Sequence, residues 1–199
     1  MKIAILGGSF DPPHLGHLLI AQQVKEYLLM DQIWLLPNHE HAFDKIMSPA
    51  KTRLEMTNLL TGNNIVISEY EIKKKGISYT IDTLRSLTKQ YPNNIFYWVL
   101  GSDQINEFQK YKDWEEIRDI YNMIIFPREN ALDTLDDKIK KAFNLKVIPK
   151  NITILQNKDL ALTNISSSMI RNRIKKGLSI NNLVLKEVEE YIKNNKLYI

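Results

Sequence analysis

Two histidines three residues apart, His14 and His17, follow a pair of glycines near the start of the chain. The apolar stretch Ile3–Leu6 predicts a buried strand that ends at this glycine pair. Apolar residues then recur at helical spacing, so the two histidines open a helix and share one of its faces. A strand that leads into a helix N-terminus can bind phosphate, because free N–H groups lie there. We therefore expect a phosphate site that uses imidazoles in place of a P-loop lysine.

Common glycine-rich phosphate motifs do not fit this segment. The dinucleotide fingerprint GxGxxG would need glycine at Phe10 and Pro13, and the chain has no GxxxxGK[ST] P-loop. Taken alone, however, HxGH is a weak pattern, because such histidines are more often packing or surface residues. Asp11-Pro12-Pro13 is also ordinary chemistry for a helix start. The assignment therefore depends on other segments of the chain.

Three further segments could belong to the same site. Ligands of open α/β sheets bind beyond the carboxyl ends of strands, and both residues 37–45 and Gly101-Ser102-Asp103 follow apolar strands. Serines 166–168 precede a helical pattern and can bind an anion through free N–H groups, although, taken alone, they are better explained as an ordinary helix cap. Arg171, five residues after the first of these serines, is by itself compatible with a surface position.

Strand and helix patterns alternate along most of the chain, which predicts a doubly wound, parallel α/β sheet of the Rossmann-like type. Helices are expected over Leu15–Leu28, over Arg53–Leu60, and between Ser78 as N-cap and Pro92. Lys73–Gly76 is expected to be a solvated turn. The expected strands are Ile3–Leu6, Ile33–Leu36, Ile65–Ile67, Ile95–Leu100, Tyr121–Phe126 and Ile152–Leu155.

The last part of the chain has only helical patterns. Serines at the start, lysines in the last turn and Gly177 delimit a helix over Ser166–Lys176, and a second apolar face runs from Val184 to Ile192. A chain of 199 residues is long enough for one full core. We therefore expect a single domain over residues 1–199, with residues 166–199 as a C-terminal helical portion.

Composition narrows the classes of function. The chain has no cysteine, which excludes disulfides and thiolate metal sites and is consistent with a cytoplasmic location. We find no signal peptide and no apolar stretch long enough to span a membrane, so no membrane partner is expected. His39 and His41 lack a clear third ligand, so no metal site is expected there. The net charge of +4 suits an anionic ligand, or a weak nucleic-acid binder on the same scaffold, but the basic residues form no stripe.

Together, the motifs resemble the HxGH nucleotidylyltransferase superfamily. Its pattern GxFDPxHxGH matches Gly8–His17 without a gap, and its second signature ISSTxIR matches Ile165–Arg171 with serine in place of threonine. Within it, the chain most resembles the bacterial nicotinate-nucleotide adenylyltransferases over nearly its whole length: Ser78–Leu84 is similar to their TYTIDTL segment and Leu100–Asp103 to their IGAD turn. Phosphopantetheine adenylyltransferases usually have threonine at His14 and a shorter chain, and cytidylyltransferases carry a different second signature.

The resemblance implies adenylyl transfer from ATP to nicotinate mononucleotide, giving deamido-NAD and pyrophosphate in NAD biosynthesis. It implies His14, His17 and Arg171 as the catalytic residues, acting on the triphosphate. Mg²⁺ is expected as the cofactor, bound mainly through ATP phosphates, since the chain offers no dedicated carboxylate cage. The ATP-binding residues would be Gly7, Gly8, Ser9, Phe10, His14, His17, Gly101, Asp103, Ile165, Ser166, Ser167 and Arg171.

The acceptor side matches the family least closely. Its PPHK-like loop corresponds to His39–Lys45, where Lys45, assisted by His41, is expected to bind the acceptor phosphate. Thr80 would border the pyridine carboxylate, and either Tyr111 or Trp114 would stack on the ring, although core packing is the favoured explanation of Trp114. Nicotinamide mononucleotide and phosphopantetheine therefore stay open as alternative acceptors. Whether the chain forms a homo-oligomer also stays open.

Overall fold

A computed structural model describes residues 1–43, 46–62, 64–128 and 132–199. Its centre is a six-stranded sheet in the order β4-β2-β1-β6-β7-β8, in which every neighbouring pair is parallel. Counted along the chain, this order is 3-2-1-4-5-6, the doubly wound arrangement, and it reverses between β1 and β6. All six predicted strands are present: β1 (Lys2–Gly8), β2 (Gln32–Pro37), β4 (Ile65–Ile67), β6 (Ile95–Gly101), β7 (Asn122–Phe126) and β8 (Ile152–Ile154).

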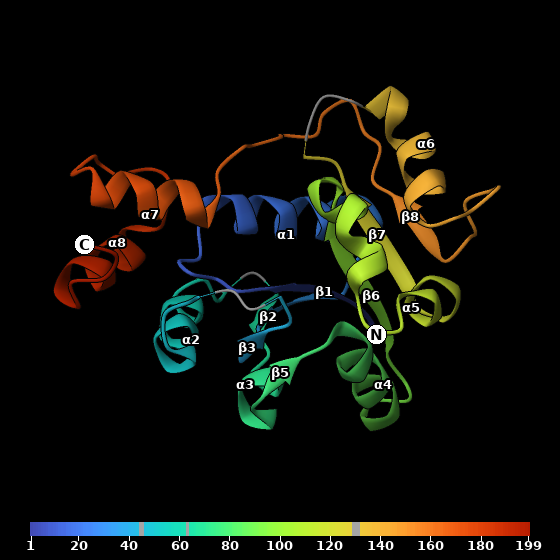
Figure 1. The fold of residues 1–199 in the computed structure, drawn as a ribbon, viewed down its shortest axis with the longest axis horizontal. Helices are drawn as coiled ribbons and strands as arrows, with labels where there is room; N and C mark the ends of the chain where they lie inside the picture. The colour runs from blue at the N-terminus through green and yellow to red at the C-terminus, as the bar shows by residue number, and fades with distance from the viewer. Residues whose placement is uncertain (44–45, 63, 129–131) are drawn as a thin grey trace.

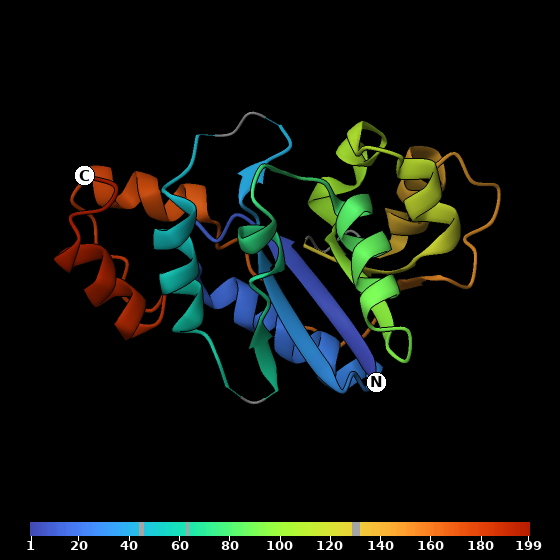
Figure 2. The ribbon, with the colours of Figure 1, turned by 90° about the horizontal axis from the view of Figure 1, so that it is seen from below.

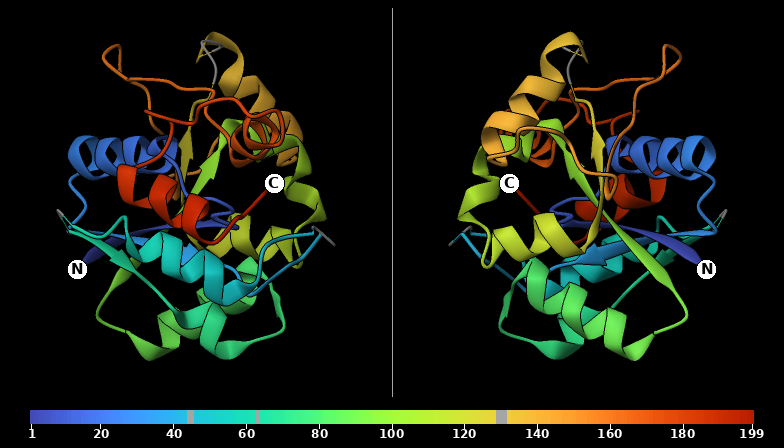
Figure 3. Two further views of the ribbon diagram at one scale, coloured as in Figure 1. Left: turned by 90° about the vertical axis from the view of Figure 1, so that its left-hand side faces the viewer. Right: turned by 90° about the vertical axis from the view of Figure 1, so that its right-hand side faces the viewer.

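Helices cover both faces of this sheet. In Figure 1, α1 lies on one side of β1 and β2, and α3 and α4 lie on the other. Figure 3 shows the strands between these helical layers from both ends of the molecule. The helices are α1 (Leu15–Leu28), α2 (Ala50–Asn58), α3 (Tyr70–Lys74), α4 (Thr80–Gln90), α5 (Trp114–Ile120), α6 (Leu132–Ala142), α7 (Ser167–Lys175) and α8 (Lys186–Asn194), with a 3-10 helix η1 over Ser102–Lys110.

Strand β1 shows why the predicted strands are continuously apolar. Ile3 and Ile5 belong to a core that includes residues of α4 and α5, whereas Ala4 and Leu6 belong to a core that includes residues of α1 and α2. All four side chains are buried. Successive side chains of a strand point to opposite faces, so a sheet that is covered on both faces needs apolar residues at every position.

The C-terminal helices belong to the same core as α1. Ile170 of α7 and Val188 and Ile192 of α8 are buried in that cluster. As expected, the α7 helix begins after Ser166, whose hydroxyl oxygen accepts a hydrogen bond from the Met169 N–H at 3.2 Å. Figures 1 and 2 show α7 and α8 on the side of the molecule where α2 lies.

Several local expectations are wrong. Tyr79, not Ser78, occupies the N-cap of α4, because the Ser78 hydroxyl accepts a hydrogen bond from the His39 N–H at 3.0 Å. Lys73 and Lys74 end α3 instead of forming a turn, although their side chains are exposed as expected. A second, two-stranded parallel sheet, β3 (Glu40–His41) with β5 (Ile77–Ser78), was not predicted. Within the described ranges, no helix is long and apolar enough to cross a membrane.

Candidate functional site

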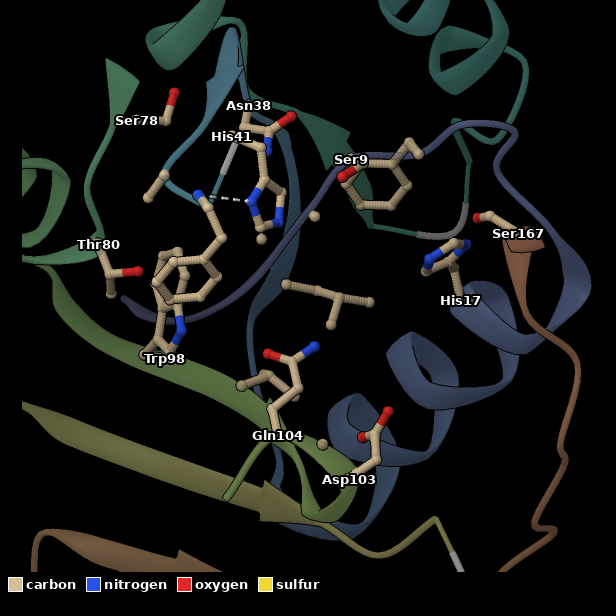
Figure 4. A pocket seen from close by; sticks show the side chains of 18 of the residues that line it. Ser9, His17, Asn38, His41, Ser78, Thr80, Trp98, Asp103, Gln104 and Ser167 are labelled. Atoms are coloured by element: carbon tan, nitrogen blue, oxygen red, sulfur yellow. Dashed lines mark hydrogen bonds between the residues drawn. The ribbon is translucent and has the colours of Figure 1, made fainter. Parts of the chain in front are cut away.

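A cleft of about 820 Å³ opens beyond the carboxyl ends of β1, β2 and β6. This is the place where a doubly wound sheet binds ligands, because the chain leaves β1 and β6 in opposite directions there. Figure 4 shows His17 and Ser167 at one end of the cleft and Thr80 and Trp98 at the other. The predicted residues that line it are Gly7, Gly8, Ser9, Phe10, His14, His17, His41, Thr80, Gly101, Asp103, Tyr111, Ser166 and Ser167.

Packing within residues 7–17 holds the two histidines in place. We name residues 7–14, which precede α1, the phosphate loop. The two histidine rings stack with centroids 3.7 Å apart. Gly16 permits this packing, because a Cβ there would come within 2.9 Å of the His14 Nδ1. Phe10 has a backbone φ of 50° and places its buried ring 4.7 Å from that of His17. Both imidazoles are therefore positioned by packing within the protein.

Both imidazoles are also neutral at pH 7. Burial and, to a smaller extent, the Arg128 guanidinium lower the pKa of His14 to about 3. Burial, together with His14 and Arg128, lowers the pKa of His17 well below its usual value. The Nδ1 of His17 accepts a hydrogen bond from the His14 backbone N–H at 3.1 Å, so the ring proton of His17 sits on Nε2. His17 is thus a hydrogen-bond donor at the cleft and not a base.

Asp11 anchors the phosphate loop to three distant segments. Its carboxylate is 2 % exposed and accepts hydrogen bonds from the Tyr198 hydroxyl at 2.7 Å and from the Ser48 N–H at 3.2 Å. Its backbone carbonyl accepts a hydrogen bond from the Arg171 guanidinium at 2.7 Å. Charge-assisted bonds of this kind are stronger than neutral ones, so the C-terminal helical portion fixes the phosphate loop.

Some residues of the second motif, Ile165–Arg171, line the cleft, and others lie outside it and support it. Ser166 and Ser167 line the cleft at the N-terminus of α7, where free N–H groups favour an anion. Arg171 does not line it, since its guanidinium donates to the Asp11 carbonyl and, at 3.2 Å, to the Ser168 hydroxyl. Ile165 also lies outside the lining residues.

Aromatic side chains gather at the end of the cleft where Thr80 lies, away from His17 (Figure 4). We call it the acceptor end. Tyr111 lies with its ring centroid 5.8 Å from that of Phe43, and its hydroxyl donates to the Gln104 side chain at 2.9 Å. Burial, with a smaller effect of the Asp103 carboxylate, raises the pKa of Tyr111 to about 12, so the phenol keeps its proton. Thr80 also lines this end, as the first residue of α4.

Two other predicted acceptor residues are not part of this aromatic group. Trp114 packs against Phe108, with ring centroids 6.2 Å apart, and beneath the Arg118 guanidinium at 5.0 Å, outside the cleft. Its position agrees with the packing interpretation. Lys45 lies outside the described residues.

Comparison with known proteins gives a consistent family assignment. The family model described as Cytidylyltransferase-like matches residues 5–173. A protein of Dictyoglomus turgidum with the name "Probable nicotinate-nucleotide adenylyltransferase" is 38% identical over 100% of this chain and 96% of its own length. A protein of the same name from Exiguobacterium sibiricum is 34% identical over 100% of this chain and 99% of its own length. The chain belongs to the nicotinate-nucleotide adenylyltransferase family.

Solved structures agree with the fold of this family member. The nicotinic acid mononucleotide adenylyltransferase of Plasmodium falciparum, complexed with NaAD, superimposes with a TM-score of 0.80 at 23% identity, over 99% of this chain and 97% of that one. The same enzyme complexed with APC gives a TM-score of 0.78, also at 23% identity, over 99% and 96% of the two chains. The shared architecture therefore extends over the whole described sheet and its helices.

The site of this nicotinate-nucleotide adenylyltransferase family member includes an arginine that the sequence analysis missed. Arg128 follows β7 and lines the cleft, where its N–H donates to the Ser102 hydroxyl at 2.9 Å. Its guanidinium donates to the Ile165 carbonyl at 3.3 Å and lowers the pKa of His14 and His17. A single arginine after a strand has no distinguishing spacing, so only the fold reveals its place. Phe43 was missed for the same reason.

Proposed function

We propose that this chain transfers an adenylyl group from ATP to nicotinate mononucleotide, releasing pyrophosphate and forming deamido-NAD for NAD biosynthesis. The observation that carries this proposal is that two neutral histidines and the N-terminus of α7 line the same cleft as an acceptor end built from Thr80 and Tyr111. One cleft thus offers an anion site beside a site for a polar aromatic ring, and full-length relatives carry the matching name.

The reaction needs no side chain that removes a proton. A phosphate monoester has a second pKa of about 6, so the mononucleotide phosphate is already ionised at pH 7. One of its oxygens attacks the α-phosphorus of ATP. The bond from this phosphorus to the oxygen bridging the β-phosphate breaks, and that oxygen leaves on pyrophosphate with the electron pair. The protein therefore has to align two anions and stabilise the charge that shifts between them.

The phosphate-loop side of the cleft fits this task. His17 Nε2–H and the His14 ring would donate to triphosphate oxygens. The backbone N–H groups of the phosphate loop would donate to the same phosphates. The N-terminus of α7 would hold the β- and γ-phosphates, with Arg171 fixing the loop through Asp11 and offering its remaining donors. Arg128 adds a charge beside the histidines, and Gly101 and Asp103 would border the nucleoside.

A divalent ion, Mg²⁺ in our proposal, would be held by the substrate and not by a protein cage. No group of three potential His, Asp or Glu ligands occurs within the described ranges. The side chains of His14, His17, Ser166, Ser167 and Arg128, which line the triphosphate end, are neutral or cationic, which suits an ion held mainly by phosphate oxygens and water. When bound, such an ion would neutralise charge on the triphosphate.

On the acceptor end, we propose that Thr80 borders the pyridine carboxylate at the N-terminus of α4. Tyr111 would stack on the pyridine ring, with Phe43 beside it. His41 lines the same end, and Lys45 remains a prediction for the acceptor phosphate. The packing of α7 and α8 into the core of α1 supports the proposal of a single domain over residues 1–199. A cytoplasmic location and the absence of nucleic-acid partners stay predictions from the sequence.

Pyrophosphate release tests the function directly. We expect release only when ATP, Mg²⁺ and nicotinate mononucleotide are all present, and a lower kcat/KM with nicotinamide mononucleotide or phosphopantetheine as acceptor. Preference for either alternative would keep the reaction type and change the acceptor. No release with any of the three acceptors would refute the proposal.

A further inference from the structure

Arg53 of α2 is a buried cation beneath the cleft, and the mechanism above does not use it. Its side chain is 1 % exposed. Its Nε donates to the Ser48 carbonyl at 2.9 Å, and its Nη2 donates to the His39 carbonyl at 2.7 Å. Its Nη1 lies 2.8 Å from the Ser9 carbonyl, 2.8 Å from the Asn38 carbonyl and 2.9 Å from the Asn38 side-chain oxygen.

The partners of Arg53 identify what this side chain holds together. Ser9 belongs to the phosphate loop, and Asn38 and His39 begin the segment that leads to His41, here named the acceptor segment (residues 38–43). The two segments already touch, since the Asn38 N–H donates to the Gly8 carbonyl at 3.0 Å. Arg53 is therefore a guanidinium clamp between the two halves of the cleft.

Stability alone does not explain an arginine at this position. Burial of a guanidinium is costly, and the attraction of the Asp11 carboxylate offsets this cost only in part, since the pKa of Arg53 is lowered overall. An apolar side chain of similar length could fill the same space but would leave these oxygens without their donor. What only arginine provides is a planar fork of five donors that fixes several carbonyls at once.

We propose that Arg53 is a positioning residue that fixes the acceptor segment against the phosphate loop and so sets the in-line approach of the acceptor phosphate to ATP. This inference rests on the proposed function. Arg53 does not line the cleft but a smaller cavity beside it that shares His41, and its guanidinium donates to the loops, so it acts through them. Loosening the clamp changes the position of the two substrates relative to each other more than the binding of either one alone.

The expected effect is a loss of kcat without an equal loss of binding. A misplacement of about 1 Å costs on the order of 10²-fold in rate. Arg53→Met should lower kcat by about 10²-fold. Arg53→Lys, which keeps the positive charge but has fewer hydrogen-bond donors, should lower kcat by about 10-fold. Dissociation constants measured with ATP alone and with nicotinate mononucleotide alone should change by only about 3-fold.

The control is a second arginine that binds a backbone carbonyl far from the cleft. The Arg118 side chain is 14 % exposed, pairs with Asp119 and donates to the Phe143 carbonyl at 3.0 Å. Arg118→Met should lower the melting temperature and leave kcat per folded molecule within about 2-fold. Rates are normalised by the folded fraction from circular dichroism, and Arg53→Lys serves alone if Arg53→Met does not fold.

The outcomes separate this inference from the proposed function. A wild-type protein that transfers no adenylyl group removes the proposed function. An active wild type whose Arg53 variants match Arg118→Met in kcat overturns the positioning role. An Arg53→Lys variant that binds each substrate much more weakly with unchanged kcat also overturns it.

Discussion

At the scale of single residues, the site depends on imidazoles that are kept neutral. Burial lowers the pKa of both His14 and His17, and the His14 N–H fixes the His17 proton on Nε2. A preorganised neutral donor can stabilise charge that develops on phosphate oxygens without exchanging a proton with them. The geometry that makes these histidines poor bases makes them suitable for phosphoryl chemistry.

Replacement of His17 tests this donor. His17→Ala should lower kcat by about 10² or more, because a preorganised donor to the transition state is lost. His17→Gln should lose less, since its amide nitrogen can reach a position near that of Nε2. Steady-state pyrophosphate release measures both variants. A near-native rate of His17→Ala would remove His17 from the mechanism.

The same pair should make the fold sensitive to acid. A histidine in the unfolded chain takes up its proton near pH 6.5, whereas folded His14, beside His17 and Arg128, has a pKa of about 3. The unfolded state therefore binds more protons in this range, and the free energy of unfolding falls as the pH is lowered from about 6.5 towards 3. The contribution of His14 is up to about 1.4 kcal/mol per pH unit.

In His14→Gln, the free energy of unfolding should fall less steeply with decreasing pH, by up to about 1.4 kcal/mol per pH unit. Urea unfolding between about pH 7 and pH 5 measures this slope. Between pH 7 and pH 8 the variant and the wild type should show the same pH slope, which serves as the internal control. An equal slope of the two proteins below pH 6 as well would contradict a neutral His14.

At the scale of elements, the C-terminal helices matter because they hold the phosphate loop. The Tyr198 hydroxyl donates to the buried Asp11 carboxylate, and Arg171 of α7 holds the Asp11 carbonyl. These contacts join segments more than 150 residues apart, with separations of 187 and 160 residues. The second motif therefore supports the first as well as lining the cleft beside it.

Tyr198→Phe tests this support by removing one hydroxyl. We expect a loss of about 1.5–3 kcal/mol in the free energy of unfolding, because the bond to a charged, buried partner is lost. The KM for ATP should also rise severalfold as the phosphate loop loosens. Tyr191→Phe is the matched control, since the Tyr191 hydroxyl donates to Glu55, which is exposed and outside the loop. Equal effects of the two variants would contradict a specific role of Tyr198.

Sequence patterns predicted many of the elements, but not α5, α6 or the 3-10 helix η1. The six strands of the main sheet, α1 and α7 agree with their apolar runs and caps. The short elements α3, β3 and β5 were missed because two to five residues are too few to show a period. Arg53 and Arg128 were missed because their roles come from loops that are distant in sequence, and no local spacing records such contacts.

At the scale of the whole molecule, charge should help to select the acceptor. The chain has a net charge of +4, and the charged residues that line the cleft within the described ranges are Lys110, Lys112 and Arg128 against Glu71 and Asp103. Burial raises the pKa of Glu71 above its usual value. A cationic cleft attracts anionic substrates, and salt screens this attraction.

Nicotinate mononucleotide carries a carboxylate where nicotinamide mononucleotide has a neutral amide, so the electrostatic attraction should favour the acid. We expect kcat/KM to favour the acid by about 10-fold or more at low salt, and this ratio to fall severalfold as KCl rises, because the Debye length shortens from about 10 Å at 0.1 M towards 3 Å at 1 M. The ratio is measured at saturating ATP, with sucrose of equal osmolarity as control. A ratio that does not change with salt would assign the acid preference to short-range contacts at Thr80 instead of to the charge of the cleft.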